Sequence, residues 1–233
     1  MRLLHRYHDY EIVGIERVPR TGGVLVAGTH GLATYESFLL ASAGSDLLGR
    51  RPIIIGDDLI FRIPWLGRTM REIGLVPRDR SAVIEMLRRG EIVGVGPGGM
   101  RDALRSSRKK YQFDWTGRLG FVWVSMLAGV PIVLAACPKA DDIYTVYDNP
   151  ITGWVYQRFR VPLPLFRGVG PTLLPRPVKL FHVFGEPIYP PVPPEHVSEA
   201  DVIRHHQYVV GRMHELIAQT LALSAQRSVS VGR

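Results

Sequence analysis

The stretch "GGVLVAGTHGLATYESFLLASAGSDL", residues 22–47, decides the fold class. Its first part, residues 22–28, is an apolar run that predicts a strand, and residues 35–47 predict a helix with one apolar side towards a core. A histidine, His30, lies in the turn between them. Strand, turn and helix in this order form the repeating unit of α/β proteins.

The same unit recurs along the chain to about residue 140. Further strands are predicted at residues 51–57, 75–78, 91–97 and 130–137, and further helices at residues 63–74, 81–90 and 118–129. The helix at 81–90 has Ser81 as its expected N-cap and Gly90 just past its end. This alternation implies right-handed crossovers, so we predict an α/β fold with a mostly parallel central sheet flanked by helices. In such sheets, functional groups gather beyond the carboxyl ends of the strands.

The remainder of the chain changes in pattern but shows no linker. Residues 154–181 mix aromatic residues and leucines with arginine and proline, and a late strand is expected within residues 178–190. A C-terminal helix is predicted over residues 198–224, with core positions at Val202, Val209, Met213, Leu216, Ile217 and Leu221. We therefore predict a single domain at residues 1–224, followed by a disordered tail at residues 225–233.

Composition and charge narrow the possible partners. A length of 233 residues suffices for one sizeable α/β domain, and the formal net charge of +8 favours phospholipid surfaces, phosphate-bearing substrates or nucleic acid. The single cysteine, Cys137, lies in an apolar run and is expected to be a buried thiol in a reducing compartment.

No targeting or membrane-spanning segment is expected. The N-terminus lacks the continuous apolar region of a signal peptide. Residues 119–138 carry no formal charge, but Gly129, Val130 and Pro131 interrupt them, so a helix, a tight turn and a strand are the better interpretation.

His30 is a candidate general base because it follows a predicted strand. A base of this kind needs a partner that fixes its tautomer and stabilises the imidazolium, and Glu36 is the first acidic residue after it. The alternative is that His30 is a structural histidine near the end of a strand.

Two further segments could bind an anion. In "VGVGPGGMRDAL", residues 93–104, the Gly98–Gly99 turn precedes Arg101 at the expected start of a helix, an arrangement that suits a phosphate. It is neither a Walker loop nor a dinucleotide-binding fingerprint, and a glycine turn with a solvated arginine is the alternative. In "IGLVPRDR", residues 73–80, Arg78 and Arg80 follow a short strand and either bind phosphate or face solvent.

In this order, the segments resemble the PlsC-like glycerolipid acyltransferase superfamily, which includes the lysophospholipid and glycerol-phosphate acyltransferases. Its second block resembles "GLVPRDR", residues 74–80, with Pro77 where phenylalanine is usual. Its third block resembles "PGGMR", residues 97–101, with Gly98 where the family commonly has glutamate, and its fourth resembles "GVPIVLAA", residues 129–136. The form "PGGMRDAL" is similar to the branch of diacylglycerol acyltransferase 2-like and transmembrane-protein-68-like proteins.

The first block departs from the family pattern, which is a histidine, four residues and an aspartate. Tyr35 stands at the aspartate position and Glu36 follows it. In a helix that began at His30, Glu36 would point about 240° away from it. A looped start near Thr34 would let Glu36 reach back; otherwise Thr34 or Tyr35 becomes the candidate orienting residue.

The resemblance implies a glycerol-phosphate acyltransferase-like fold and an O-acyltransferase. The family transfers a fatty acyl group from acyl-CoA or acyl carrier protein to a hydroxyl of a lysophospholipid, glycerolipid or other lipid alcohol. His30 would be the base and Glu36 its partner, while Arg80, Gly98, Gly99 and Arg101 would hold the acceptor. The resemblance implies no metal, no other cofactor and no covalent enzyme intermediate.

The resemblance also implies a cytoplasmic protein that associates peripherally with a membrane. Aromatic residues and leucines alternate with arginines over residues 154–167, which suits an anionic bilayer, although they could instead pack a proline-rich loop onto the core. The altered first block leaves open a catalytically silent member that binds lipid or acyl-CoA. A nucleic-acid partner is not expected, because the arginines cluster at strand-end turns without a recognised binding motif.

Overall fold

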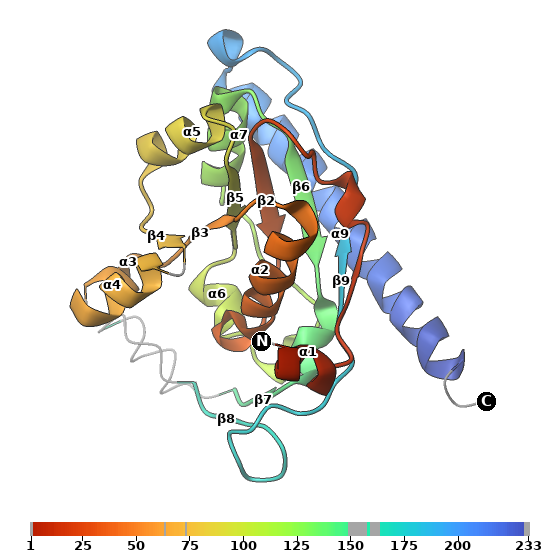
Figure 1. Cartoon of the computed structure of the whole chain (residues 1–233). Coiled ribbons are helices and arrows are strands. Elements are labelled where there is room, and N and C mark those ends of the chain that lie inside the picture. Colours follow the sequence, from red (N-terminus) through yellow and green to blue (C-terminus); the bar gives the residue numbers. More distant parts are fainter. Residues whose placement is uncertain (1, 63, 73, 149–157, 159–163, 231–233) are drawn as a thin grey trace.

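The protein is built on a central sheet with helices on both faces (Figure 1). A computed structural model describes residues 2–62, 64–72, 74–148, 158 and 164–230. Within these residues the strands of the main sheet lie in the order β1-β9-β6-β2-β5-β3-β4. Their bounds are β1 Glu11–Val13, β2 Val24–Gly28, β3 Ile53–Ile55, β4 Leu75–Val76, β5 Ile92–Val95, β6 Ile132–Ala136 and β9 Phe181–Phe184. A separate small sheet pairs β7 Thr145–Val146 with β8 Phe166–Arg167.

Most strand pairs are parallel, as predicted. β2 lies between β5 and β6 and is parallel to both, and β3 is parallel to β5 and β4. β9 is parallel to β1 but antiparallel to β6. The prediction of an α/β fold with a mostly parallel central sheet is confirmed.

The helices connect the strands and cover the sheet. Their bounds are α1 Arg2–Tyr7, α2 Tyr35–Leu48, α3 Asp58–Phe61, α4 Pro64–Glu72, α5 Arg80–Arg88, α6 Met100–Ala103, α7 Gly120–Ala128 and α9 Glu199–Ser230. Short 3₁₀ turns are η1 Ile15–Arg17, η2 Leu32–Thr34, η3 Ser107–Lys109, η4 Pro138–Asp142 and η5 Pro194–His196. In Figure 1, α2 lies in front of the sheet, whereas α7 and α9 lie behind it.

The core follows from alternation along buried strands. In β6, Ile132 and Leu134 belong to the cluster that contains the α7 and α9 side chains, whereas Val133 and Ala135 belong to a second cluster with residues of α2. Every residue of β6 is buried, as expected for a strand covered on both faces. Cys137, directly after β6, is a buried free thiol, as predicted.

The C-terminal helix is longer than the sequence predicts. Its predicted core positions are buried or packed against the core, and Val202, Val209 and Met213 are completely buried. Residues 225–230, expected in a disordered tail, continue the helix to Ser230. Arg227 forms an ion pair with Glu11, and its guanidinium lies over the Phe181 ring, at 5.3 Å from the ring centroid. These contacts with β1 and β9 explain why the helix continues.

A second correction concerns the start of α5. The structure uses Asp79 as its N-cap, with the carboxylate accepting a hydrogen bond from the Ala82 amide at 3.1 Å, so the prediction of Ser81 was wrong. An aspartate is as good an N-cap as a serine, and the helix begins one residue earlier.

The apolar segment at residues 119–138 forms α7, a turn at Gly129 and β6, as predicted. In the described part of the chain, no helix has both the length and the apolarity that crossing a bilayer requires. Within the arginine- and aromatic-rich segment at residues 154–167, only residues 158 and 164–167 are described, and Leu165 is 56% exposed. Trp154, Tyr156, Phe159, Arg160 and Leu163, which the membrane prediction also uses, lie outside the described residues.

The packing of α9 predicts a graded effect of substitutions along this helix. Met213→Ala is expected to lower the free energy of unfolding by about 2–5 kcal/mol, because it removes a fully buried side chain from the main core. Tyr208→Ala is the control, since this side chain is 58% exposed on the same helix, and its expected effect is within about 0.5 kcal/mol. Urea unfolding measures both, and equal effects would contradict the assignment of the buried face.

Candidate active site

Three chain segments meet at one edge of the sheet. His30 follows β2, the glycine turn at residues 96–99 follows β5, and η4 follows β6. Because β5, β2 and β6 are adjacent and parallel, their carboxyl ends lie side by side. This is the edge at which sites form in open α/β sheets.

The imidazole of His30 packs against the backbone of Gly96. A Cβ atom on Gly96 would lie 2.5 Å from His30 Cδ2 and 2.8 Å from His30 Nε2, so no larger residue fits without moving the ring. Nδ1 is 3.3 Å from the carbonyl oxygen of Gly31, which can only accept, so Nδ1 carries the proton and Nε2 is the free base. The His30 side chain is almost fully buried.

After the glycine turn, the chain places an aspartate at the same edge of the sheet as His30. Asp102, in α6, is 2% exposed, and its Oδ2 atom would lie 2.0 Å from a Cβ atom on Gly98. Its Oδ1 accepts a long hydrogen bond from the Asp114 amide at 3.5 Å and pairs with Arg105 Nη1 at 3.3 Å. Gly98, predicted as a substrate-binding residue, therefore makes room for a buried carboxylate.

Arg105 connects this carboxylate to a second one. Its Nη2 lies 2.7 Å from Asp141 Oδ1 and 3.4 Å from the backbone oxygen of His30. Asp141 Oδ2 accepts a hydrogen bond from the Tyr111 amide at 2.7 Å. His30, Asp102, Arg105 and Asp141 thus form one buried polar cluster that joins the ends of β2, β5 and β6.

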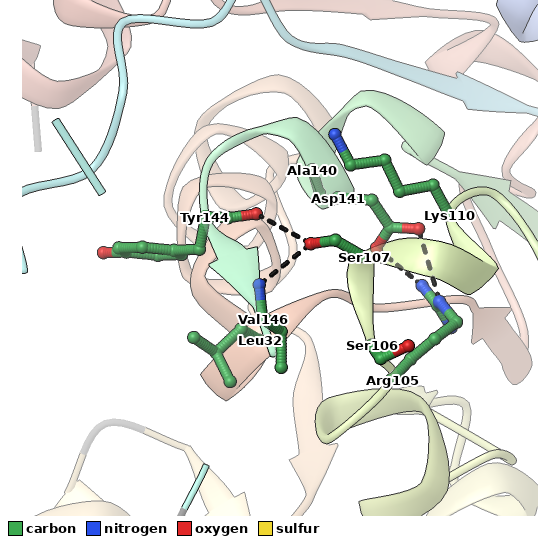
Figure 2. A pocket seen from close by; sticks show the side chains of 9 residues that line it. All are labelled: Leu32, Arg105, Ser106, Ser107, Lys110, Ala140, Asp141, Tyr144 and Val146. Carbon is green, nitrogen blue, oxygen red and sulfur yellow. Dashed lines mark hydrogen bonds and ion pairs between the residues drawn. The ribbon is translucent and has the colours of Figure 1, made fainter. Parts of the chain in front are cut away.

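The cluster borders two small pockets. Figure 2 shows one of them, where Arg105 faces Asp141 and the Ser107 hydroxyl lies between the Tyr144 carbonyl and the Val146 amide. The other pocket shares Arg105 and Asp141 and is also lined by Thr29, His30, Gly31, Tyr111, Gln112, Cys137, Pro138 and Ile217. His30 therefore borders one of these two cavities.

Burial and charge set the protonation of the cluster. Burial lowers the pKa of His30, and the carboxylate of Asp102 is the strongest opposing influence. Burial raises the pKa of Asp102, while Arg105 and His30 act in the opposite direction. His30 is therefore neutral at neutral pH and able to accept a proton.

Glu36 reaches back as far as the loop but not to the imidazole. Helix α2 starts at Tyr35 after a left-handed Thr34 with φ of 54°, which is the looped start that the sequence suggests. The Glu36 carboxylate is buried, and its Oε1 accepts a hydrogen bond from the Gly31 amide at 2.9 Å. Among the hydrogen bonds of the described residues, none joins Glu36 to the His30 ring. Burial also raises the pKa of Glu36 to about 7.

Tyr35, at the aspartate position of the family pattern, faces another part of the molecule. Its hydroxyl hydrogen-bonds His8 Nε2 at 3.0 Å, and its ring packs on the cluster that contains Leu39 and Leu180. The side chain at the position where the family places its carboxylate is thus directed towards His8, the residue that follows α1.

The structure separates the predicted acceptor-binding residues. Gly99 and Arg101 follow β5, next to β2, and Arg101 is exposed and paired with Asp114 at 3.2 Å. Arg80 instead lies over the ring of Trp123, at 5.0 Å from its centroid. It follows β4, which is three strands, or roughly 14 Å, from β2.

Three charged residues of the site were missed from the sequence. Asp102 and Arg105 follow the glycine turn with the three-residue spacing of one helix face, and Asp141 follows the end of β6. Each position follows a strand that ends at the same edge as β2, and this signal could have identified them.

Known proteins share this fold and these segments. A model of the Acyltransferase family matches residues 9–137, which is more than half of the chain. The crystal structure of the 1-acyl-sn-glycerophosphate acyltransferase PlsC from Thermotoga maritima superposes with a TM-score of 0.52 at 18% identity, covering 92% of this chain and 75% of that one. This likeness supports the fold.

Curated relatives are similar over most of the chain. A protein of Bos taurus named "DGAT1/2-independent enzyme synthesizing storage lipids" is 27% identical over 89% of this chain and 63% of its own length. An uncharacterized protein of Mycobacterium leprae is 29% identical over 95% of this chain and 62% of its own. The chain spans less than two thirds of the length of these relatives. On the family match and the fold, the chain belongs to the PlsC-like acyltransferase superfamily.

Proposed function

We propose that this chain transfers a fatty acyl group from an acyl thioester to the hydroxyl of a lipid, with His30 as the general base. The observation that carries the proposal is a buried, neutral imidazole at the end of the central strand, bordering a pocket and surrounded by charged residues. The family to which the chain belongs supports the same chemistry.

In the proposed reaction, Nε2 of His30 takes the proton of the acceptor hydroxyl as its oxygen attacks the carbonyl carbon of the thioester. The new carbon–oxygen bond forms, and the carbon–sulfur bond then breaks. The leaving thiolate takes the proton back from the imidazolium, so the enzyme is regenerated without a covalent intermediate. Cys137 takes no part, and burial raises its pKa well above the ordinary value for a thiol.

For the acceptor we propose an uncharged lipid alcohol, such as a mono- or diacylglycerol. The arginines near the turn have carboxylate partners: Arg101 pairs with Asp114, and Arg105 pairs with Asp102 and Asp141. A phosphate group would have to displace one of these carboxylates. The name of the Bos taurus relative, an enzyme synthesizing storage lipids, points in the same direction. The donor is acyl-CoA or acyl carrier protein.

We further propose that the enzyme works at a membrane surface. On α4, Trp65 is 71% exposed and lies near the exposed Arg68 in the sequence. In the loop that follows β8, Leu173 and Leu174 are 66% and 65% exposed. Exposed tryptophan and leucine beside arginine suit the interface of an anionic bilayer.

One observation favours a second function, which is lipid or acyl-CoA binding without turnover. The carboxylate position of the first block is Tyr35, whose hydroxyl is bonded to His8. A member that lacks the usual partner of the base could retain binding and lose catalysis.

A lipid panel separates these functions. Purified protein is given radiolabelled acyl-CoA or acyl carrier protein together with lysophospholipids, monoacylglycerol or diacylglycerol. Transfer is expected for the wild type, and His30→Gln is expected to lower the rate by about 10²–10⁴-fold, the usual contribution of a general base. If wild type and His30→Gln are equally inert throughout the panel while binding the donor, the binding function replaces the proposal. A preference for lysophospholipids would contradict the uncharged acceptor.

The close contact between Gly96 and the imidazole generates a second prediction. Gly96→Ala is expected to lower kcat by about a hundredfold, because the added Cβ displaces the His30 ring from its position. Gly120→Ala is the matched control, since nothing lies within 4 Å of a Cβ at that position. Thermal unfolding of both variants separates a local displacement from a loss of fold. A fully active, folded Gly96→Ala protein would show that the ring position is not critical.

A further inference from the structure

We propose that Asp102 is the carboxylate partner of His30, a positioning residue that takes the role which the family's first block assigns to the position of Tyr35. Asp102 would act through its charge, without a hydrogen bond to the ring, and would stabilise the imidazolium that forms when His30 accepts the acceptor's proton. This inference rests on the proposed function.

The placement of Asp102 is the first argument. The backbone of the glycine turn lies against both side chains, since a Cβ atom on Gly96 would meet the His30 ring and one on Gly98 would meet the Asp102 carboxylate. The two side chains therefore occupy neighbouring sites under one short segment of backbone. Among the charged groups around the imidazole, the Asp102 carboxylate has the largest influence on its pKa.

An unsatisfied oxygen is the second argument. Within the described residues, Asp102 Oδ2 is buried and makes no hydrogen bond of normal length, although the Trp115 side chain acts as a weak donor that lowers the pKa of this carboxyl. Leaving a buried carboxylate oxygen without a partner is costly and rare in folded proteins. In the proposed role, the positive charge that forms on His30 stabilises this buried oxygen.

The charge of the cluster is the third argument. Asp102, Arg105 and Asp141 are each no more than 10% exposed, and together they carry one net negative charge. Protonation of His30 makes the whole cluster neutral. In a buried region, where charges interact strongly, this balance favours the imidazolium during the reaction.

The two competing candidates are occupied elsewhere. Oε1 of Glu36 accepts a hydrogen bond from the Gly31 amide, and burial raises the pKa of Glu36 to about 7, so it is a weak counter-ion at neutral pH. Tyr35 is bonded to His8. Glu36 therefore fixes the backbone of the loop, and Asp102 acts on the imidazole.

The test is the pH dependence of turnover in Asp102→Asn. Asparagine keeps the shape of the side chain and can still accept from the Asp114 amide, but it removes the negative charge. The pKa of His30 should fall further, so the acid limb of the kcat profile moves to lower pH. The plateau of kcat should drop by about tenfold to a hundredfold, since one pKa unit corresponds to tenfold in a proton equilibrium. KM should change little.

A second variant tests the same claim without removing the carboxylate. Gly98→Ala places a Cβ atom 2.0 Å from the present position of Asp102 Oδ2 and so pushes the carboxylate away from the cluster. The same fall in kcat and the same shift of the acid limb are expected. If Asp102→Asn does not fold, Gly98→Ala takes its place as the test of the role of Asp102. Asp148→Asn is the control, because this exposed carboxylate only approaches Arg108 at 3.9 Å.

Glu36→Gln completes the comparison. This variant should keep the wild-type kcat and the acid limb of the kcat profile, because the glutamine carbonyl can accept the hydrogen bond from the Gly31 amide. Its effect should appear in stability instead. Burial raises the pKa of Glu36 to about 7 from an ordinary value of 4.5, so the folded state binds this proton more tightly than the unfolded state. The wild type therefore loses stability as pH rises from about 4.5 through 7, and Glu36→Gln should lose less over that interval.

The outcomes are distinguishable. Equal inactivity of wild type and His30→Gln would overturn the proposed function itself. An active wild type that depends on His30, together with wild-type kcat and acid limb in folded Asp102→Asn and Gly98→Ala, would overturn the role of Asp102 alone. A fall in kcat with a shifted acid limb in Glu36→Gln would assign the role to Glu36.

Discussion

The parallel pairing of β2 with both β5 and β6 is the interaction on which the site depends. It fixes the register of three strands, Val26 opposite Gly94 and Val133, and so brings their carboxyl ends to one level of the sheet. His30, the glycine turn and η4 begin directly beyond those ends. Residues more than a hundred positions apart in the chain, His30 and Asp141, belong to one buried cluster because of this pairing.

Two glycines make the cluster compact. Gly96 and Gly98 allow the backbone of the turn to lie against the His30 ring and the Asp102 carboxylate, respectively. Arg105 then connects Asp102 to Asp141. The glycines predicted to cradle a substrate anion thus have a second explanation, which is the close packing of the protein's own charged groups.

The elements of the fold were largely predictable, because each buried strand is a short apolar run and each helix has an apolar face. The position of His30 at the end of the central strand was also predictable, because an apolar run directly precedes it in the sequence. The proposed role of Asp102 was not predictable, because the position of Asp102 relative to His30 depends on the pairing of β2 with β5 and on the course of the glycine turn. Tyr35 was ambiguous for the same reason: only the packing of His8, which is hydrogen-bonded to the Val178 carbonyl and to Tyr35, shows which way the Tyr35 side chain points. The start of α5 and the end of α9 depend on individual contacts of Asp79 and Arg227, which periodicity does not reveal.

The central claim is that the charge on Asp102, and not that on Glu36, acts on the imidazole of His30. The most direct measurement is the titration of His30 by ¹⁵N-histidine NMR in the wild type, Asp102→Asn and Glu36→Gln, with His30→Gln used to assign the signal. The account predicts a pKa below the ordinary value of 6.5 in the wild type, a still lower pKa in Asp102→Asn, and no change in Glu36→Gln. An unchanged pKa in Asp102→Asn, or a lowered pKa in Glu36→Gln alone, would contradict it.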